Sequence, residues 1–169
     1  MQPTKAYKTE HIGCLAVSDD GQMFASGNLD GAITIQHMGP ANRKLALKDK
    51  AWVHGLKFSA NGCMLVSSSS TGSKSRISVW EVASGRVRSS FEINDHVADL
   101  DTSPDGKLVA LAQAGGVASL WDAWTHTQMA VFERHNNELL RVALGQDGRL
   151  MATTGLDAML MIWNVPKGQ

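Results

Sequence analysis

Ser103-Pro104-Asp105-Gly106 is the stretch that decides the fold, because three related tetrapeptides occur elsewhere in the chain. They are Ser18-Asp19-Asp20-Gly21, Ser59-Ala60-Asn61-Gly62 and Gly145-Gln146-Asp147-Gly148. Their terminal glycines stand 41, 44 and 42 residues apart, and apolar stretches flank each tetrapeptide. An Asx-Gly pair between two apolar stretches is the strongest short-range sign of a β-hairpin. The chain is therefore predicted to contain four repeats, each with a hairpin near its start.

Tryptophan marks a second position with the same period. Trp80, Trp121 and Trp163 are 41 and 42 residues apart, and Gln36 holds the matching place 44 residues before Trp80. Short apolar runs separated by Gly, Ser, Asn and Asp predict four antiparallel strands per repeat, with three visible in the last. The predicted repeats span residues 11–50, 51–94, 95–135 and 136–169.

Composition excludes several classes of protein. The chain has 169 residues, of which 43% are hydrophobic and 19% charged, so it is not intrinsically disordered. Its formal net charge of zero argues against nucleic acid or an anionic membrane as a partner. Because neither a signal peptide nor an apolar run of membrane-spanning length is visible, we expect a cytoplasmic protein.

Two local features are predicted to have structural rather than functional roles. Cys14 and Cys63 lie in separate apolar runs, so both are predicted to be buried free thiols. The segment Ser67–Ser75 is predicted to be an enlarged surface loop between two strands. Its Gly and Ser residues could cradle a phosphate, but no helix N-terminus follows, and we therefore favour a flexible loop.

These repeats resemble those of the WD-repeat (WD40-type) β-propeller family, over nearly the whole chain. The third repeat carries Leu120-Trp121-Asp122, and the second and fourth end in Val79-Trp80-Glu81 and Ile162-Trp163-Asn164. The resemblance implies an all-β propeller of four-stranded antiparallel blades, with four blades in this chain.

The resemblance also implies a buried hydrogen-bond relay in some blades. In the fourth repeat its members would be His135, Thr153, Asp157 and Trp163. The second and third repeats have Lys74 and Gly115 where the relay aspartate would stand, and the first has Gln36 in place of Trp. We expect those three blades to rely on apolar packing. The relay is structural rather than a catalytic triad, because its hydroxyl belongs to a strand threonine.

In this family, the face where the innermost strands begin commonly binds proteins or peptides. The residues expected on this face are His11, Trp52, His54, His96, Glu138, Leu29 and Leu156. Trp52 is predicted either to anchor a partner or to pack over the neighbouring blade. The resulting prediction is a non-catalytic interaction scaffold. One alternative is a regulatory or sensor propeller domain of a larger protein or complex.

A second alternative is a hydrolase that uses His11, His54 and His96 at the channel, together with Asp99. Three histidines could also bind zinc, but equivalent atoms of successive blades should lie too far apart for shared ligation. We therefore predict no catalytic residues, no metal and no cofactor.

The two ends of the chain suggest how the ring closes. Residues 4–9 occupy the place of an outer strand, and the fourth repeat lacks such a strand after Val165. Leu56, Phe58 and Leu100 are predicted to lie near the axis and to be too bulky for a ring of four blades. We therefore expect half of a larger ring, completed as a homodimer or by another WD-repeat chain, rather than a four-bladed monomer.

Overall fold

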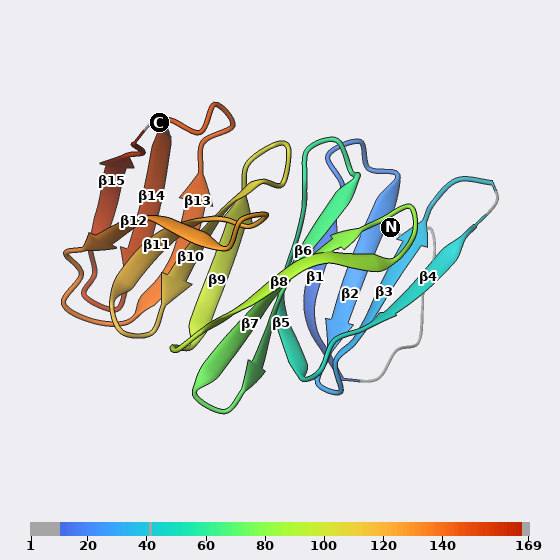
Figure 1. Cartoon of the computed structure of the whole chain (residues 1–169), viewed down its shortest axis with the longest axis horizontal. Coiled ribbons are helices and arrows are strands. Elements are labelled where there is room, and N and C mark those ends of the chain that lie inside the picture. Colours follow the sequence, from blue (N-terminus) through green and yellow to red (C-terminus); the bar gives the residue numbers. More distant parts are fainter. Residues whose placement is uncertain (1–10, 41, 167–169) are drawn as a thin grey trace, which may run out of the picture.

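The computed structural model describes residues 11–40 and 42–166, and all regular structure in this part is β-strand. The strands form four antiparallel sheets, which we call blades A to D in chain order (Figure 1). Blade A consists of β1 (Ile12–Val17), β2 (Met23–Asn28), β3 (Ala32–His37) and β4 (Lys44–Lys48), and blade B of β5 (Trp52–Phe58), β6 (Met64–Thr71), β7 (Lys74–Glu81) and β8 (Arg86–Ile93). Blade C consists of β9 (Val97–Thr102), β10 (Leu108–Gln113), β11 (Val117–Asp122) and β12 (Thr127–Glu133), and blade D of β13 (Leu139–Leu144), β14 (Leu150–Gly155) and β15 (Leu160–Asn164). The predicted all-β fold of four antiparallel blades is confirmed.

Each predicted Asx-Gly tetrapeptide forms the turn between the first two strands of its blade. The terminal glycines Gly21, Gly62, Gly106 and Gly148 have φ between 65° and 72°, which other residues rarely adopt. In blade C, the Ser103 hydroxyl donates to Asp105 Oδ1 over 2.6 Å and accepts the Leu108 N–H over 2.9 Å. Gly145 replaces this serine in blade D, but its N–H still donates to the Leu150 carbonyl.

The innermost strand of every blade contains a β-bulge at the same position. The residues that the bulges leave without a cross-strand partner are Gly13, His54, Ala98 and Leu140. A bulge bends its strand and redirects the side chain of the extra residue. In blade B that residue is a histidine, which matters for the candidate site.

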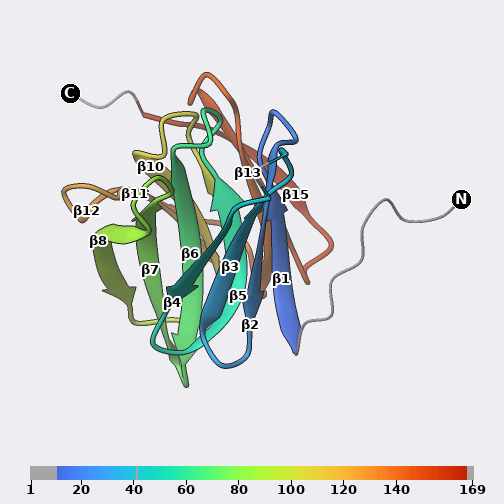
Figure 2. The ribbon, with the colours of Figure 1, turned by 90° about the vertical axis from the view of Figure 1, so that its right-hand side faces the viewer.

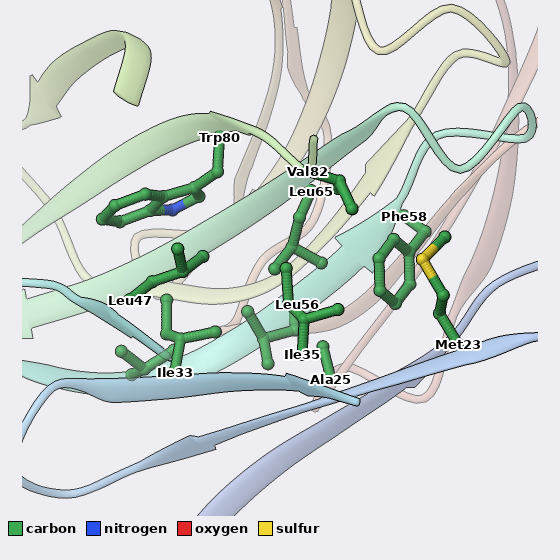
Figure 3. Close-up of a cluster of buried hydrophobic side chains, with 11 residues drawn as sticks. Met23, Ala25, Ile33, Ile35, Leu47, Leu56, Phe58, Leu65, Trp80 and Val82 are labelled. Atoms are coloured by element: carbon green, nitrogen blue, oxygen red, sulfur yellow. The ribbon is translucent and has the colours of Figure 1, made fainter. Parts of the chain in front are cut away.

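The hydrophobic core lies between consecutive blades rather than within them. Figure 3 shows the first of three clusters, in which side chains of blade A meet those of blade B. Equivalent clusters join blade B to blade C and blade C to blade D. Burying one Leu, Ile or Phe side chain stabilises a fold by about 1.5–3 kcal/mol, so these clusters dominate the stability of the chain. Leu56, Phe58 and Leu100, which were predicted to lie near the ring axis, belong to these clusters.

Blade C also makes polar contacts to the inner edge of blade D. Asp99 Oδ2 accepts the Val142 N–H over 3.1 Å, and Asp101 Oδ2 accepts the Leu144 N–H over 2.8 Å. Asp101 is paired in addition with Lys57 Nζ at 3.0 Å. Two backbone donors at the free edge of β13 are thus satisfied by carboxylates of the preceding blade.

Two local predictions from the sequence are wrong. Cys14 is half-buried, but Cys63 is exposed because it directly follows the turn glycine Gly62. The segment Ser67–Ser75 is a hairpin: β6 continues to Thr71 and β7 begins at Lys74. Four of its serines, Ser67, Ser68, Ser69 and Ser75, are buried, and packing between the blades here overrides the weak strand preference of serine.

The predicted closing strand at residues 4–9 lies outside the described residues. Figure 2 gives the perpendicular view of the blades. Within the described part of the chain, no helix is long and apolar enough to cross a membrane.

Candidate interaction face and its histidine pair

The candidate site lies where the innermost strands of blades B and C begin. The bulge in β5 directs His54 towards His96, which directly precedes β9, and the two ring centroids are 5.1 Å apart. Trp52 meets His54 edge to face, with a centroid distance of 5.8 Å. The fold thus joins three of the predicted face residues in one aromatic cluster.

Ser70, near the end of β6, lies between the two imidazole rings. Its Oγ is 2.7 Å from His54 Nε2 and 3.3 Å from His96 Nδ1. Burial, together with the neighbouring His96, lowers the pKa of His54 from 6.5 to about 4. His54 is therefore neutral at physiological pH, and it places a polar but uncharged ring beside Trp52.

Trp52 is both packed and exposed. A Cβ on Gly13 of blade A would stand 2.8 Å from Trp52 Nε1, so the indole rests on this glycine and no side chain fits there. The side chain nevertheless keeps 44% of its surface exposed. Trp52 therefore packs over the neighbouring blade and also presents part of its surface to solvent.

The structure places the other predicted face residues in two separate pairs. The Leu29 N–H donates to the His11 carbonyl in blade A, and the Leu156 N–H donates to the Glu138 carbonyl in blade D. All four residues are exposed. No recorded contact joins His11 to His54 or His96, so these three histidines do not form one group in the described residues.

In the part of the chain that the structure describes, neither histidine ring of the pair has a carboxylate partner. Across residues 11–40 and 42–166, no carboxylate lies within hydrogen-bond distance of the His54 or His96 ring, so neither base has an orienting partner. Asp99 is bonded to blade D instead, and burial raises its pKa. The same residues contain no group of three or more His, Cys, Asp or Glu side chains that could hold a metal ion.

The four relay residues of blade D form one continuous chain of hydrogen bonds. Trp163 Nε1 donates to Thr153 Oγ1 over 2.8 Å, and His135 Nε2 lies 2.8 Å from the same oxygen. His135 Nδ1 is 2.9 Å from Asp157 Oδ2. Burial of Asp157 opposes ionisation, but bonds from His135 and from two backbone N–H groups hold its pKa below the usual value.

The prediction that the other blades lack polar relays is wrong. In blade B, Trp80 Nε1 donates to Ser67 Oγ over 2.9 Å, and that hydroxyl donates to Asp49 Oδ2 over 3.0 Å. In blade C, Trp121 Nε1 donates to Ser119, whose hydroxyl donates to Gln113 Oε1 over 2.6 Å. Gln36 of blade A bonds through Nε2 to the Asn42 side chain and to nearby carbonyls.

Comparison with known proteins agrees with this architecture. A sequence model of the WD40 family, described as WD domain, G-beta repeat, matches residues 2–35 and 126–164. In these two segments the chain is similar to WD-repeat proteins. The matched segments include strands of blades A and D and the last strand of blade C, and blade B shows the same four-stranded pattern.

Three curated proteins show the same relationship. The chain is 25% identical to Protein groucho of Drosophila melanogaster over 170 residues, which are 99% of the chain and 21% of that protein. It is 27% identical to Protein HIR1 of Candida albicans over 185 residues, covering 96% of the chain and 19% of that protein. It is 24% identical to Small ribosomal subunit protein RACK1 of Brassica napus over 142 residues, covering 84% of the chain and 42% of that protein. The chain therefore spans less than half the length of each.

The sequence patterns did not point to Ser70 or to the relay residue Asp49. Asp49 stands four residues before Val53, just as His135 stands four before Leu139, so an acidic residue at the histidine position was the available signal. Ser70 had no such signal. Its role depends on the length of β6 and on the bulge at His54, neither of which the sequence pattern shows.

Proposed function

We propose that this chain is a non-catalytic interaction module that binds a peptide or protein on the face formed by Trp52, His54 and His96. The observation that carries the proposal is the half-exposed indole of Trp52, which Gly13 supports from below and His54 contacts from the side. An aromatic side chain already held in one orientation loses little entropy when a partner covers it, and such residues dominate interface energies.

The neutral state of His54 supports the same proposal. A charged imidazole beside Trp52 would have to be desolvated when a partner covers the face, and the low pKa of His54 avoids this penalty. The exposed pairs His11 with Leu29 and Glu138 with Leu156 would extend the contact onto blades A and D. By its name, the relative RACK1 is itself a component of a larger assembly, the small ribosomal subunit.

A matched pair of tryptophan variants tests the proposal. Trp52→Ala should abolish capture of specific proteins from a lysate, as measured by quantitative mass spectrometry, with little change in melting temperature. Trp124→Ala is the control, because Trp124 is similarly exposed at 40% but packs against Arg88 at a different site. Proteins lost equally with both variants, or with neither, would contradict the proposed role of Trp52.

A second candidate function is a regulatory or sensor domain within a longer protein. The observation that favours it is that the chain spans only 19% to 42% of the relatives it matches. The same face would then bind a partner on behalf of that protein. The intact mass of the endogenous protein separates the two candidates.

We propose further that the chain acts in the cytoplasm, and that its ring is completed as a homodimer or by another WD-repeat chain. The exposed apolar surfaces of its first and last blades support the completion of the ring by a second chain.

A further inference from the structure

The exposure of residues at the three blade–blade interfaces inside the chain can be compared with that at its two outer surfaces. In blades B, C and D, the innermost strand packs against the preceding blade through two positions, which are at most 8% exposed. These residues are Leu56 and Phe58, Leu100 and Thr102, and Val142 and Leu144. The equivalent residues of blade A, Leu15 and Val17, are each 65% exposed. Blade A thus presents the surface that a preceding blade covers elsewhere.

Blade D leaves the opposite side of its sheet uncovered. In blades A, B and C, two positions on the third strand pack against the following blade and are fully buried. These residues are Ile33 and Ile35, Ile77 and Val79, and Ala118 and Leu120. The equivalent residues of blade D, Leu160 and Ile162, are 64% and 68% exposed. Blade D thus presents the surface that a following blade covers elsewhere.

The two surfaces are the two halves of one interface type. We call the first the A face (Ile12, Leu15 and Val17) and the second the D face (Leu150, Leu160 and Ile162). Figure 1 places blades A and D at opposite ends of the long axis, so the two faces do not meet within one chain. Large exposed apolar surfaces of this kind mark sites of protein association.

The turns of two blades add a further contact between consecutive blades. In blades B and C, the turn glycine lies close to a residue at the start of the second strand of the preceding blade. A Cβ on Gly62 would stand 2.8 Å from Met23 Cε, and a Cβ on Gly106 would stand 3.2 Å from Met64 Cβ. Gly21 of blade A and Gly148 of blade D each have nothing within 4 Å of that position, so the turn glycines alone do not distinguish a covered blade from an uncovered one. On the D face, the residue equivalent to Met23, Leu150, is exposed.

We infer that the D face of one copy packs on the A face of a second copy, repeating the interface that joins consecutive blades within the chain. In a two-fold dimer both D faces meet both A faces, which gives a closed ring of eight blades and leaves neither face exposed. A second copy is the occupant because it carries both complementary halves in the required form. The inference rests on the proposed function only in that it specifies how the ring is completed.

Light scattering coupled to size-exclusion chromatography tests the inference at micromolar concentration. The chain should elute at twice its mass of 18.2 kDa. Ile162→Asp and Leu15→Asp should each weaken the dimer by at least about 30-fold in Kd, as expected for a central interface residue. Val131→Asp is the control, because Val131 is a half-exposed valine on β12, outside both faces, and this variant should remain dimeric.

Mixing the two variants identifies the mode of pairing. Head-to-tail packing makes each variant monomeric alone, whereas an equimolar mixture regains one intact interface and forms a heterodimer. Pairing of like faces would instead leave each variant dimeric through its intact face, and that result would overturn the inference. A wild-type monomer of 18.2 kDa would also overturn the inference, because a second copy would then not cover the faces. An open polymer would overturn it as well, because the ring would then not close.

These outcomes are separate from those of the proposed function. Trp52 lies on neither face, so Trp52→Ala should lose partner capture and still elute at the dimer mass of the wild type. Conversely, a monomeric chain that still captures partners through Trp52 would overturn the dimer alone.

Discussion

Blades B and D satisfy the tryptophan at the same repeat position with different chemistry. In both, the indole N–H donates to a hydroxyl on the second strand, which is Ser67 in blade B and Thr153 in blade D. In blade D the hydroxyl meets His135, which needs Asp157 in the next turn to orient it. In blade B the hydroxyl donates directly to Asp49, so the turn has no relay function. The β6–β7 hairpin is thereby free to extend, and its extension brings Ser70 to the histidine pair.

Removing the shared hydroxyl from blade B should have the largest effect on stability. Ser67→Ala leaves the Trp80 N–H and the buried Asp49 carboxylate without this partner, and we expect a loss of about 2–3 kcal/mol. Urea denaturation measures the loss, with the slope of the transition unchanged.

Ser69→Ala is the matched control for that experiment. Ser69 lies on the same strand and is equally buried, but within the described residues its Oγ has no hydrogen-bond partner. Its replacement should leave stability within about 0.5 kcal/mol of the wild type or raise it. Similar losses for both serines would mean that the relay of blade B contributes nothing.

The histidine pair should make the stability of blade B depend on pH. Because folding lowers the pKa of His54 from 6.5 to about 4, the unfolded chain binds a proton between these values that the folded chain does not. The free energy of unfolding therefore falls as the pH decreases from 6.5 towards 4, because protonation then favours the unfolded chain. Above pH 6.5 His54 is neutral in both states and does not change stability with pH. His54→Gln should flatten the dependence of the unfolding free energy on pH in this window, as measured by urea denaturation.

His37→Gln, a change of the same kind in blade A, serves as the control for the pH experiment. It should leave the slope of stability against pH closer to that of the wild type. An unchanged slope in His54→Gln would show that His54 is not the group that titrates abnormally.

A substitution in the turn that holds Asp157 should have the smallest effect on stability. Ala158 has a φ of 60°, whereas glycine occupies the equivalent positions of blades A and C, with φ of 83° at Gly31 and 80° at Gly116. Ala158→Gly should relieve this strain and stabilise the chain by about 0.5–1 kcal/mol. Gly116→Ala should do the reverse, because its Cβ would stand 3.0 Å from the His135 and Asn137 carbonyl oxygens. Thermal unfolding of both variants measures the effect, and a destabilised Ala158→Gly would contradict it.

The sequence was sufficient for the strand order because its turn glycines and tryptophans repeat with one period. It was insufficient wherever a polar residue serves a role normally filled by another type. Asp49 replaces a histidine, and the serines of β6 replace the apolar residues expected of a buried strand. The histidine pair required a bulge at His54, which depends on how β5 and β6 register and not on residue type. The residues of the candidate face could therefore be named in advance, whereas their grouping could not.

The carboxylates of Asp99 and Asp101 determine the direction in which blade D can grow. An incoming strand would have to displace both before it could accept the Val142 and Leu144 N–H groups at the inner edge of β13. At the other edge of the sheet, β15 pairs with β14 alone among the described strands. Strand addition to this blade is therefore directed outwards, so that a closing segment, or a foreign peptide in its place, would extend the rim of the molecule and leave its centre unchanged.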